Sequence, residues 1–560
     1  MNKIVLNLVF LFSFISADAQ NFHWAARFGY NLLATRIITD NCGHIYVTGR
    51  AAAFTDFDPG PGFYNAPDYG MYLQKLDTNG NLIWAKTFPG GAFPSALDIL
   101  GDSAIVITGS LGAATDFDPG AGTYTLTPHP FGGDGDVFVV KTDSSGELAW
   151  AKSIGSNWNI EFARSVCFDS QGNVLFTGTT GDSTDYDPGA GTFHIVNGMY
   201  NSGIFVEKLD ANGNFIWAKK IDAGNIGTGI LCGSADDVYV KGHWGPGVCD
   251  FDPGTGIFNM DSDSGQNFIL HLDANGNFLW AKQFISTGTA WDDYSDDFAM
   301  DGAGNLFIAS GFGQTADFDP DPTATYTMDA ANGAGFVMKL RPTGELLWAK
   351  QFHMVARAIT VDMNDDCYVT GKLNDPCDFD PDAGVYNVTP EDNDIFVLKL
   401  NSSGGFNWVR TIANKASFNF YNSIAADQYR NVYMIGAFMD TTDLDPGPGT
   451  HILSPIQQPK NDFYLKLGEY EVTSAGFVNK AVEIDVYPNP GAGVVFVSVE
   501  DASAKGNITV SDIAGNHVYT EALNGLRIYN IPLTGAANGL YFVEVKTDKG
   551  ITTRKVEVVR

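Results

Sequence analysis

An internal repeat constrains this chain more than any other feature. The string Asp-x-Asp-Pro occurs seven times, and successive copies lie 60 residues (56 to 116) to 69 residues (116 to 185) apart. A supersecondary unit that recurs at such a period buries its apolar face against its neighbours, so the whole array forms one fold. The copies begin at Asp56, Asp116, Asp185, Asp250, Asp317, Asp378 and Asp443.

Each repeat contains four stretches typical of β-strands. A run of β-branched and aromatic residues such as 45–49 precedes the Asp-x-Asp-Pro string, and a run such as 138–141 follows it. A turn such as 77–81, with Asn-Gly, then leads to a strand that carries Trp-Ala-Lys, and a weaker strand such as 163–168 completes the set. Asn-Gly supplies the positive φ angles of a tight hairpin, so we expect four antiparallel strands per repeat. The repeated Trp residues are Trp84, Trp150, Trp217, Trp280, Trp348 and Trp408.

The two ends of the repeat region complement each other. The seventh repeat runs from Asn431 to Leu467 without a Trp strand, whereas residues 23–27, around Trp24, form a Trp strand without a repeat. Adding this strand to the last repeat removes the exposed strand edges that an open solenoid would leave. The sequence therefore predicts an all-β fold, with a seven-bladed β-propeller over residues 20–467 that is closed by an N-terminal strand.

The repeat is similar to that of a known bacterial family. Its pattern is Gly-Asn-x-Tyr-Val-Thr-Gly, then Asp-x-Phe-Val-x-Lys-Leu-Asp-x-x-Gly-Asn-x-x-Trp, over about residues 21–467. This resembles the seven-bladed β-propeller repeat family of bacteria. The resemblance implies a propeller fold in an extracellular protein, but it implies no single activity.

The N-terminus has the pattern of a secretory signal peptide. Lys3 precedes an apolar run from Ile4 to Ile15, and Ala17-Asp18-Ala19 fits a cleavage site of small residues. Residues 1–19 would then be removed, and Gln20 would begin the mature chain. The run is too short to cross a bilayer, and no other stretch reaches about 20 apolar residues, so we expect no membrane span.

The repeat stops before residue 482, and 468–481 has the place of a linker. Short alternating strands separated by Gly, Asn and Pro predict a small Ig-like β-sandwich over 482–560. Its motifs are similar, in order, to those of the C-terminal sorting domain of type IX secretion cargo, which implies the type IX machinery as a partner and an extracellular or outer-surface location in a Gram-negative bacterium. An ordinary Ig-like binding module would share the fold. The motif residues are Tyr487, Pro488, Asn489, Pro490, Asp512, Gly515, Gly539 and Tyr541.

The charge of the chain excludes some partners. It has 33 basic and 65 acidic residues, a formal charge of −32. Such a field repels phosphate, so we expect no nucleic acid as a partner. It favours cationic or calcium-bridged partners.

The Asp-x-Asp-Pro loops have two interpretations. Paired carboxylates are oxygen ligands for Ca²⁺, although one pair supplies only part of the six to eight oxygens required. Alternatively, Asp-Pro-Gly forms a type II turn with Gly at its third position, and the residue between the two Asp points inward. The pairs are Asp56 and Asp58, Asp116 and Asp118, Asp185 and Asp187, Asp250 and Asp252, Asp317 and Asp319, Asp378 and Asp380, and Asp443 and Asp445.

Six cysteines in an exported chain can form disulfides. Cys232 with Cys249, and Cys367 with Cys377, are the local pairs that the sequence suggests, and buried free thiols are the alternative.

The sequence contains no recognised catalytic motif. Glu161, Glu207 and Arg164 depart from the repeat pattern, but nothing in the sequence pairs them. Trp24 and the six repeated Trp residues suit packing between blades, whereas Trp158, Trp244 and Trp291 are candidates for exposed contacts with sugar or peptide. We therefore expect a non-catalytic binding or adhesion module for an extracellular protein or glycan. A glycan-active enzyme and a calcium-stabilised structural surface protein are the alternatives.

Overall fold

The computed structural model describes residues 20–27, 32–60, 62–64, 68–129, 135–156, 161–180, 183–196, 203–221, 226–262, 266–284, 297–413, 423–455, 461–469, 484–487, 494–499, 505–512, 517–524, 526–533, 535–547 and 550–559. The expected signal peptide lies outside these ranges. The regular elements of the described residues are β-strands in antiparallel sheets, with no helix among them. The chain divides into two compact units, residues 1–470 and 471–560.

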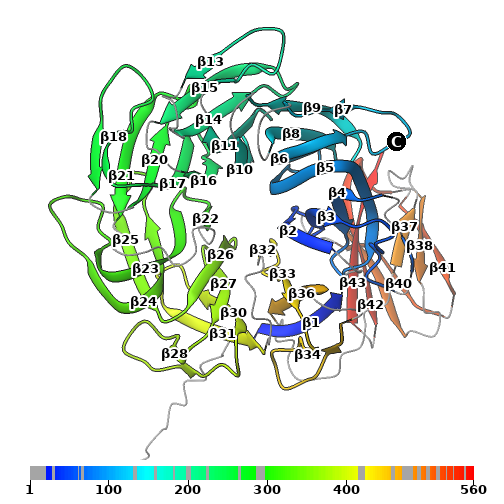
Figure 1. Ribbon diagram of the computed structural model, residues 1–560. Helices are drawn as coiled ribbons and strands as arrows, with labels where there is room; N and C mark the ends of the chain where they lie inside the picture. Colours follow the sequence, from blue (N-terminus) through cyan, green and yellow to red (C-terminus); the bar gives the residue numbers. More distant parts are fainter. Residues whose placement is uncertain are drawn as a thin grey trace, which may run out of the picture. The chain divides into compact units, whose positions relative to one another are not determined.

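In the first unit, four-stranded sheets follow the chain order, as expected for the repeat. One of them consists of β10 (Phe162–Phe168), β11 (Val174–Thr180), β14 (Gly203–Leu209) and β15 (Phe215–Ile221). Figure 1 shows such sheets arranged around a centre, with β2, β10, β16, β22, β26 and β32 nearest to it. The sheets of the same order are β16 (Ile226–Cys232), β17 (Val238–Trp244), β20 (Gln266–Leu272) and β21 (Phe278–Phe284); β22 (Asp297–Met300), β23 (Leu306–Asp317), β24 (Thr327–Leu340) and β25 (Leu346–Phe352); and β26 (Val355–Val361), β27 (Cys367–Leu373), β30 (Asp394–Leu400) and β31 (Phe406–Ile412).

The first two repeats are joined by one long strand. β5 (Leu82–Leu100) pairs through its first part with β4 (Gly70–Leu76) and through its second part with β6 (Ala104–Asp116). It is therefore the outer strand of the first repeat and the inner strand of the second. The remaining strands of this continuous sheet are β2 (Leu32–Thr39), β3 (Ile45–Ala51), β7 (Thr125–Leu126), β8 (Asp136–Asp143) and β9 (Leu148–Ile154).

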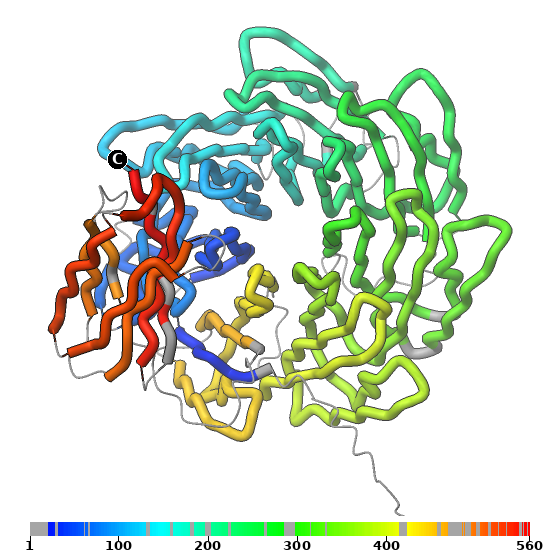
Figure 2. Tube along the Cα trace, turned by 180° about the vertical axis from the view of Figure 1, so that it is seen from behind, coloured from blue at the N-terminus to red at the C-terminus, as the bar shows by residue number. Residues whose placement is uncertain are grey.

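Strands from the two ends of the unit share one sheet. β1 (Gln20–Arg27) pairs with β36 (Asn461–Glu469), with Trp24 opposite Lys466 and Arg27 opposite Phe463. The sheet continues through β33 (Val432–Phe438) to β32 (Ser423–Ala426). Figure 2 shows β1, in blue, beside the yellow and orange strands of the last repeat. The N-terminal strand thus supplies the outer strand that the last repeat lacks.

Short two-stranded hairpins extend several of the Asp-x-Asp-Pro loops. They pair residues on either side of the loop, as between Asp185 and His194. These hairpins are β12 (Ser183–Asp185) with β13 (His194–Val196), β18 (Gly247–Asp250) with β19 (Asn259–Ser262), β28 (Cys377–Asp378) with β29 (Asn387–Val388), and β34 (Thr442–Asp443) with β35 (Ile452–Leu453).

The repeated tryptophan joins one repeat to the next. Trp150 Nε1 donates a hydrogen bond to the carbonyl of Ala211, at 3.0 Å, in the β14–β15 turn of the following repeat. The indole lies against Gly213, whose φ is +78°, and a Cβ there would stand 2.8 Å from Trp150 Cδ2. Lys141 Nζ donates to the same carbonyl at 3.0 Å. The expected packing of these Trp residues between repeats is confirmed.

A disulfide joins neighbouring repeats, and it differs from the expected pairing. Cys167 in β10 is bonded to Cys232 in β16, so Cys232 is not paired with Cys249. Cys367 and Cys377 are buried thiols rather than a local disulfide. Burial raises the pKa of both to about 12, which keeps them protonated. The two bonded cysteines are 65 residues apart, close to one repeat, so the repeat period was the signal that a search for local pairs overlooked.

The second unit contains two antiparallel sheets around one apolar core. The core includes Val495, Val497, Ile508, Val543 and Val556. Alternate residues of each strand point inward, which explains the alternation of apolar and polar residues in the sequence. One sheet has the order β37 (Ile484–Tyr487), β38 (Val494–Val499), β41 (Ile528–Pro532), and the other has the order β40 (His517–Ala522), β39 (Gly506–Asp512), β42 (Gly539–Thr547), β43 (Gly550–Val558).

Candidate functional site

The seven Asp-x-Asp-Pro loops share one hydrogen-bond pattern. In the first, Asp56 Oδ1 accepts the backbone N–H groups of Asp58, at 3.1 Å, and Tyr64, at 2.8 Å. Asp58 Oδ1 accepts the N–H of Gly60 at 2.8 Å. The same bonds recur in the other six copies. The residue between the two Asp is buried in each copy, as expected.

The turn is not the expected type II turn. That type needs a positive φ at its third residue, but Gly60 and the corresponding Gly120, Gly189, Gly254 and Gly447 do not adopt one. The side chain of the second Asp instead accepts the N–H two residues on, which is an Asx turn. Asp321 and Asp382 can therefore replace Gly in two copies.

These contacts limit how the loops could hold Ca²⁺. One oxygen of each carboxylate already accepts backbone N–H groups, which organise the loop without a cation. Asp58 Oδ2 also lies close over Gly62, where a Cβ would stand 1.9 Å from it. The arrangement explains the repeated Asp residues by loop geometry, and calcium at these loops stays a prediction.

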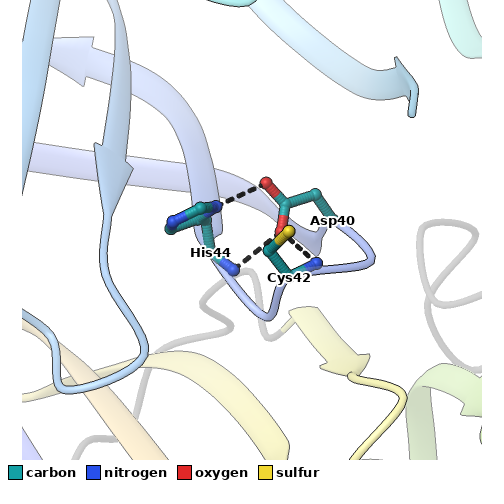
Figure 3. Close-up of side chains that lie close together, drawn as sticks. All are labelled: Asp40, Cys42 and His44. Carbon is teal, nitrogen blue, oxygen red and sulfur yellow. Dashed lines mark hydrogen bonds and ion pairs between the residues drawn. The ribbon is translucent and has the colours of Figure 1, made fainter. Parts of the chain in front are cut away.

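Asp40, Cys42 and His44 form a further cluster, in the turn between β2 and β3. One potential ligand atom of each lies within 4.8 Å of the others (Figure 3). Asp40 accepts N–H groups from Cys42, at 2.9 Å, and His44, at 2.8 Å, and pairs with His44 Nδ1 at 2.8 Å. Burial raises the pKa of Asp40, but the hydrogen bonds from His44 and Cys42 outweigh it and leave the pKa below its ordinary value.

The same turn in other repeats explains the cluster. Asn173, Asn305 and Asn431 donate from Nδ2 to Asp169, Asp301 and Asp427 at 2.7–2.8 Å. His44 takes the place of these asparagines, so its contact with Asp40 is a feature of the turn. The sequence interpretation missed this cluster because it considered Cys42 only as a disulfide partner.

The candidate ligand-contact tryptophans are not brought together. Trp244 is fully buried and packs edge-on against Phe251 and Phe268, so the exposed aromatic contact expected there is not what the structure shows. Trp244 is the last residue of β17, and its side chain lies in the core between repeats. Trp158 and Trp291 lie outside the described residues.

Glu207, which departs from the repeat, is fully buried in β14. Neither carboxylate oxygen has a hydrogen-bond partner among the described residues. Desolvation by burial, with the nearby charges of Asp187 and Asp185, raises its pKa well above the ordinary value. The side chain therefore lies in the core, and burial favours its neutral form.

The sorting-motif residues occupy strand ends in the second unit. Tyr487 ends β37 and is half-exposed, and Asp512 ends β39 opposite Tyr541. Tyr541 is buried, and its hydroxyl donates to the carbonyl of Ala537 at 2.9 Å. Gly539 begins β42 with a φ of +154°. Pro488, Asn489, Pro490 and Gly515 lie outside the described residues.

Comparison with known families identifies this second unit. Residues 485–559 match the secretion system C-terminal sorting domain. The chain thus carries a sorting domain that indicates cargo of type IX secretion, with the secretion machinery as a partner and a secreted or cell-surface destination. No helix among the described residues is long and apolar enough to cross a membrane.

The similarities to other proteins are weak. An uncharacterized WD repeat-containing protein of Acanthamoeba polyphaga mimivirus is 25% identical over 256 residues, which cover 38% of this chain and 18% of that protein. Among solved structures, the Neurospora crassa Pan2 WD40 domain has a TM-score of 0.38 at 8% identity, covering 78% of this chain and 89% of that one. A Dyadobacter fermentans protein of unknown function has a TM-score of 0.31 at 12% identity, covering 80% and 100%.

Proposed function

We propose that residues 20–467 form a closed seven-bladed β-propeller that acts as a non-catalytic binding or adhesion module at the outer surface of a Gram-negative bacterium. In this proposal residues 1–19 are the signal peptide, 468–481 are the linker, and the Ig-like domain 482–560 directs export. The proposal has three parts: ring closure, export and ligand binding.

A contact across the centre supports closure. Arg36 in β2 and Asp297 in β22 form an ion pair with two hydrogen bonds, of 2.9 and 3.3 Å. These strands belong to the first and fifth repeats, which are not neighbours along the chain (Figure 1). In an open solenoid each repeat contacts only its neighbours. A ring brings the inner strands of distant blades together at its axis.

One observation carries the binding part of the proposal. The residue eight positions after the first Asp of each loop, or nine in the fifth copy, has an aromatic ring, and in six copies this residue is 38–48% exposed. Hydroxyl contacts such as Tyr64 to the carbonyl of Ala85, at 3.2 Å, fix some of these rings against the outer strand. Fixed, partly exposed rings suit stacking on sugars or peptides, and repetition allows several weak contacts to act together. The rings belong to Tyr64, Tyr124, Phe193, Phe258, Tyr326 and Tyr386.

The test is a glycan and protein array probed with the mature chain, with and without calcium. Replacing Tyr64, Tyr124 and Tyr326 by Ala should weaken binding to every array ligand. Tyr429→Ala is the control, because this tyrosine is 60% exposed in the turn between β32 and β33. Equal loss in both variants, or binding that neither change affects, would contradict the proposal. Release of sugar products from a bound glycan would favour the glycan-active enzyme, and binding that needs calcium would favour the loops as calcium sites.

A further inference from the structure

Two buried acidic residues lie at the junction of the second and third repeats. Asp136 is the Asp of the Asp-x-Phe-Val pattern, whereas Glu161 departs from the repeat. Asp136 begins β8, and Glu161 directly precedes β10. The strand registers place Gly70, Gly203 and Asp394 at the position of Asp136 in other repeats, and Leu32 at the position of Glu161. At the position of Glu161 a carboxyl group thus replaces a buried leucine. Asp136 and Glu161 are each 1% exposed.

Each carboxylate has partners on one oxygen only. Asp136 Oδ2 pairs with His129 Nδ1 at 2.9 Å. Glu161 Oε1 accepts the hydroxyls of Ser156 and Thr184, the latter at 2.9 Å. Among the described residues, Asp136 Oδ1 and Glu161 Oε2 have no hydrogen-bond partner. Nor does any Lys or Arg in the described ranges form an ion pair with either group.

The two groups are close enough to affect each other. The N–H of Glu161 donates to the carbonyl of Gly135, next to Asp136, at 3.4 Å. Burial is the main cause that raises the pKa of Glu161, and the charge of Asp136 adds to it. Gly155 leaves room for Asp136, because a Cβ there would stand 2.2 Å from Asp136 Oδ1. Two buried carboxylates with unpartnered oxygens need a cation or a shared proton.

We propose that Asp136 and Glu161 bind a calcium ion that links the second repeat to the third. The oxygens of Asp136 Oδ1 and Glu161 Oε2, with the hydroxyls of Ser156 and Thr184, are the hard donors that Ca²⁺ prefers. A divalent ion neutralises both charges, which a single Lys or Arg would not. The site differs from the Asp-x-Asp-Pro loops, in which backbone N–H groups already hold each carboxylate, and it is independent of the proposed ligand binding.

The experiment measures calcium binding to the mature full chain by equilibrium dialysis with ⁴⁵Ca²⁺, and thermal unfolding in calcium and in EGTA. Wild-type protein should bind calcium and unfold at a higher temperature in its presence. Glu161→Gln removes the charge but keeps the shape, so it should lose one equivalent of calcium and the calcium-dependent shift in Tm. Asp136→Asn should do the same, so a folding defect in one variant leaves the other to decide.

The matched control replaces both aspartates in a loop of the same repeat, with Asp116→Asn and Asp118→Asn. This variant should keep the equivalent that Glu161→Gln loses. A wild-type protein that binds no calcium would overturn the proposal. So would calcium binding that Glu161→Gln and Asp136→Asn leave unchanged. A Glu161→Gln variant that is more stable than wild type in both calcium and EGTA would indicate a shared proton instead.

Discussion

The junction between the last and the first repeat can be compared with a junction inside the array. At the internal junction, Trp150 and Lys141 both donate to the carbonyl of Ala211, at 3.0 Å. At the terminal one, Trp24 and Lys466 both donate to the carbonyl of Thr78, at 3.3 and 2.9 Å. The two junctions therefore use the same contacts, although Trp24 and Lys466 come from opposite ends of the chain.

The difference between these junctions lies in covalent connection. Inside the array a hairpin joins the Lys strand to the Trp strand, but in the last sheet these strands are β36 and β1, which no turn connects. Trp408 Nε1, in the preceding repeat, is buried without a hydrogen-bond partner among the described residues, as is Trp280 Nε1 inside the array, whereas Trp150, Trp217 and Trp348 donate to a carbonyl of the next repeat. At the junction between the last and the first repeat, packing and strand pairing replace a covalent link. We therefore expect this junction to be the weakest of the array.

Removing β1 tests that junction most severely. A chain that starts at residue 32 would expose the edge of β36 and lose the Trp24 contacts. We expect a loss of about 5 kcal/mol or more in the free energy of unfolding, comparable with the whole stability of many domains. Urea unfolding followed by tryptophan fluorescence measures it. A synthetic peptide of residues 20–30 should restore part of the loss, and an unchanged midpoint would show that β1 does not close the ring.

Replacing one tryptophan at each junction compares them directly. Trp24→Ala and Trp150→Ala should each cost about 2 to 4 kcal/mol, because each removes an indole packed on a glycine turn and one hydrogen bond. Similar losses in a denaturant titration would mean that the terminal junction is as well formed as the internal one. A much smaller loss for Trp24→Ala would mean that the array is open in solution.

The sequence predicted the features that follow from repetition. Trp24 was assigned to the last sheet because a Trp strand was missing there, and the pairing of β1 with β36 has that arrangement. At Asp58 and its counterparts the sequence predicts type II turns rather than the observed Asx turns, because Asp-Pro-Gly fits both and only the φ of Gly60 separates them. The missing Trp strand of the seventh repeat can be recognised from the sequence alone, whereas the backbone conformation of a turn cannot.

Contacts between distant residues escaped the sequence interpretation. Asp136 fits the repeat pattern, and nothing in the sequence pairs Glu161, because the proximity of the two residues depends on how the second and third repeats pack. Arg36 and Asp297, 261 residues apart, carry no local signal at all. The Cys167–Cys232 disulfide shows that a pairing between neighbouring repeats is predictable only when the repeat period guides the search.

Breaking the Arg36–Asp297 pair tests the proposed ring away from its junctions. Asp297→Asn leaves a partly buried guanidinium without its counter-charge, so we expect a loss of about 1 to 3 kcal/mol in the free energy of unfolding. Arg341→Ala is the control, since its pair with Glu345 is exposed on both sides and should change stability by less than about 0.5 kcal/mol. Equal small effects of both variants in chemical denaturation would place Arg36 and Asp297 apart in solution.

Glu207 allows an internal junction to be tested through a buried carboxyl group. It shares a strand face with Phe205 and Leu209, which pack in the core between the second and third repeats. Its folded-state pKa lies well above that of the unfolded chain. Above the unfolded pKa of about 4.3 the unfolded state therefore binds fewer protons than the folded one, and stability falls as the pH rises towards the folded pKa.

Glu207→Gln should remove this pH dependence and raise the stability at pH 7 by about 1 kcal/mol. Gln74, at the same position of the first repeat, shows why: its amide donates to the carbonyl of Phe57, and the corresponding carbonyl here is that of Tyr186. Thermal unfolding from pH 4 to pH 8 measures both effects. Wild type and Glu207→Gln with parallel pH profiles would mean that Glu207 ionises in the folded protein, and that water reaches the junction between the second and third repeats.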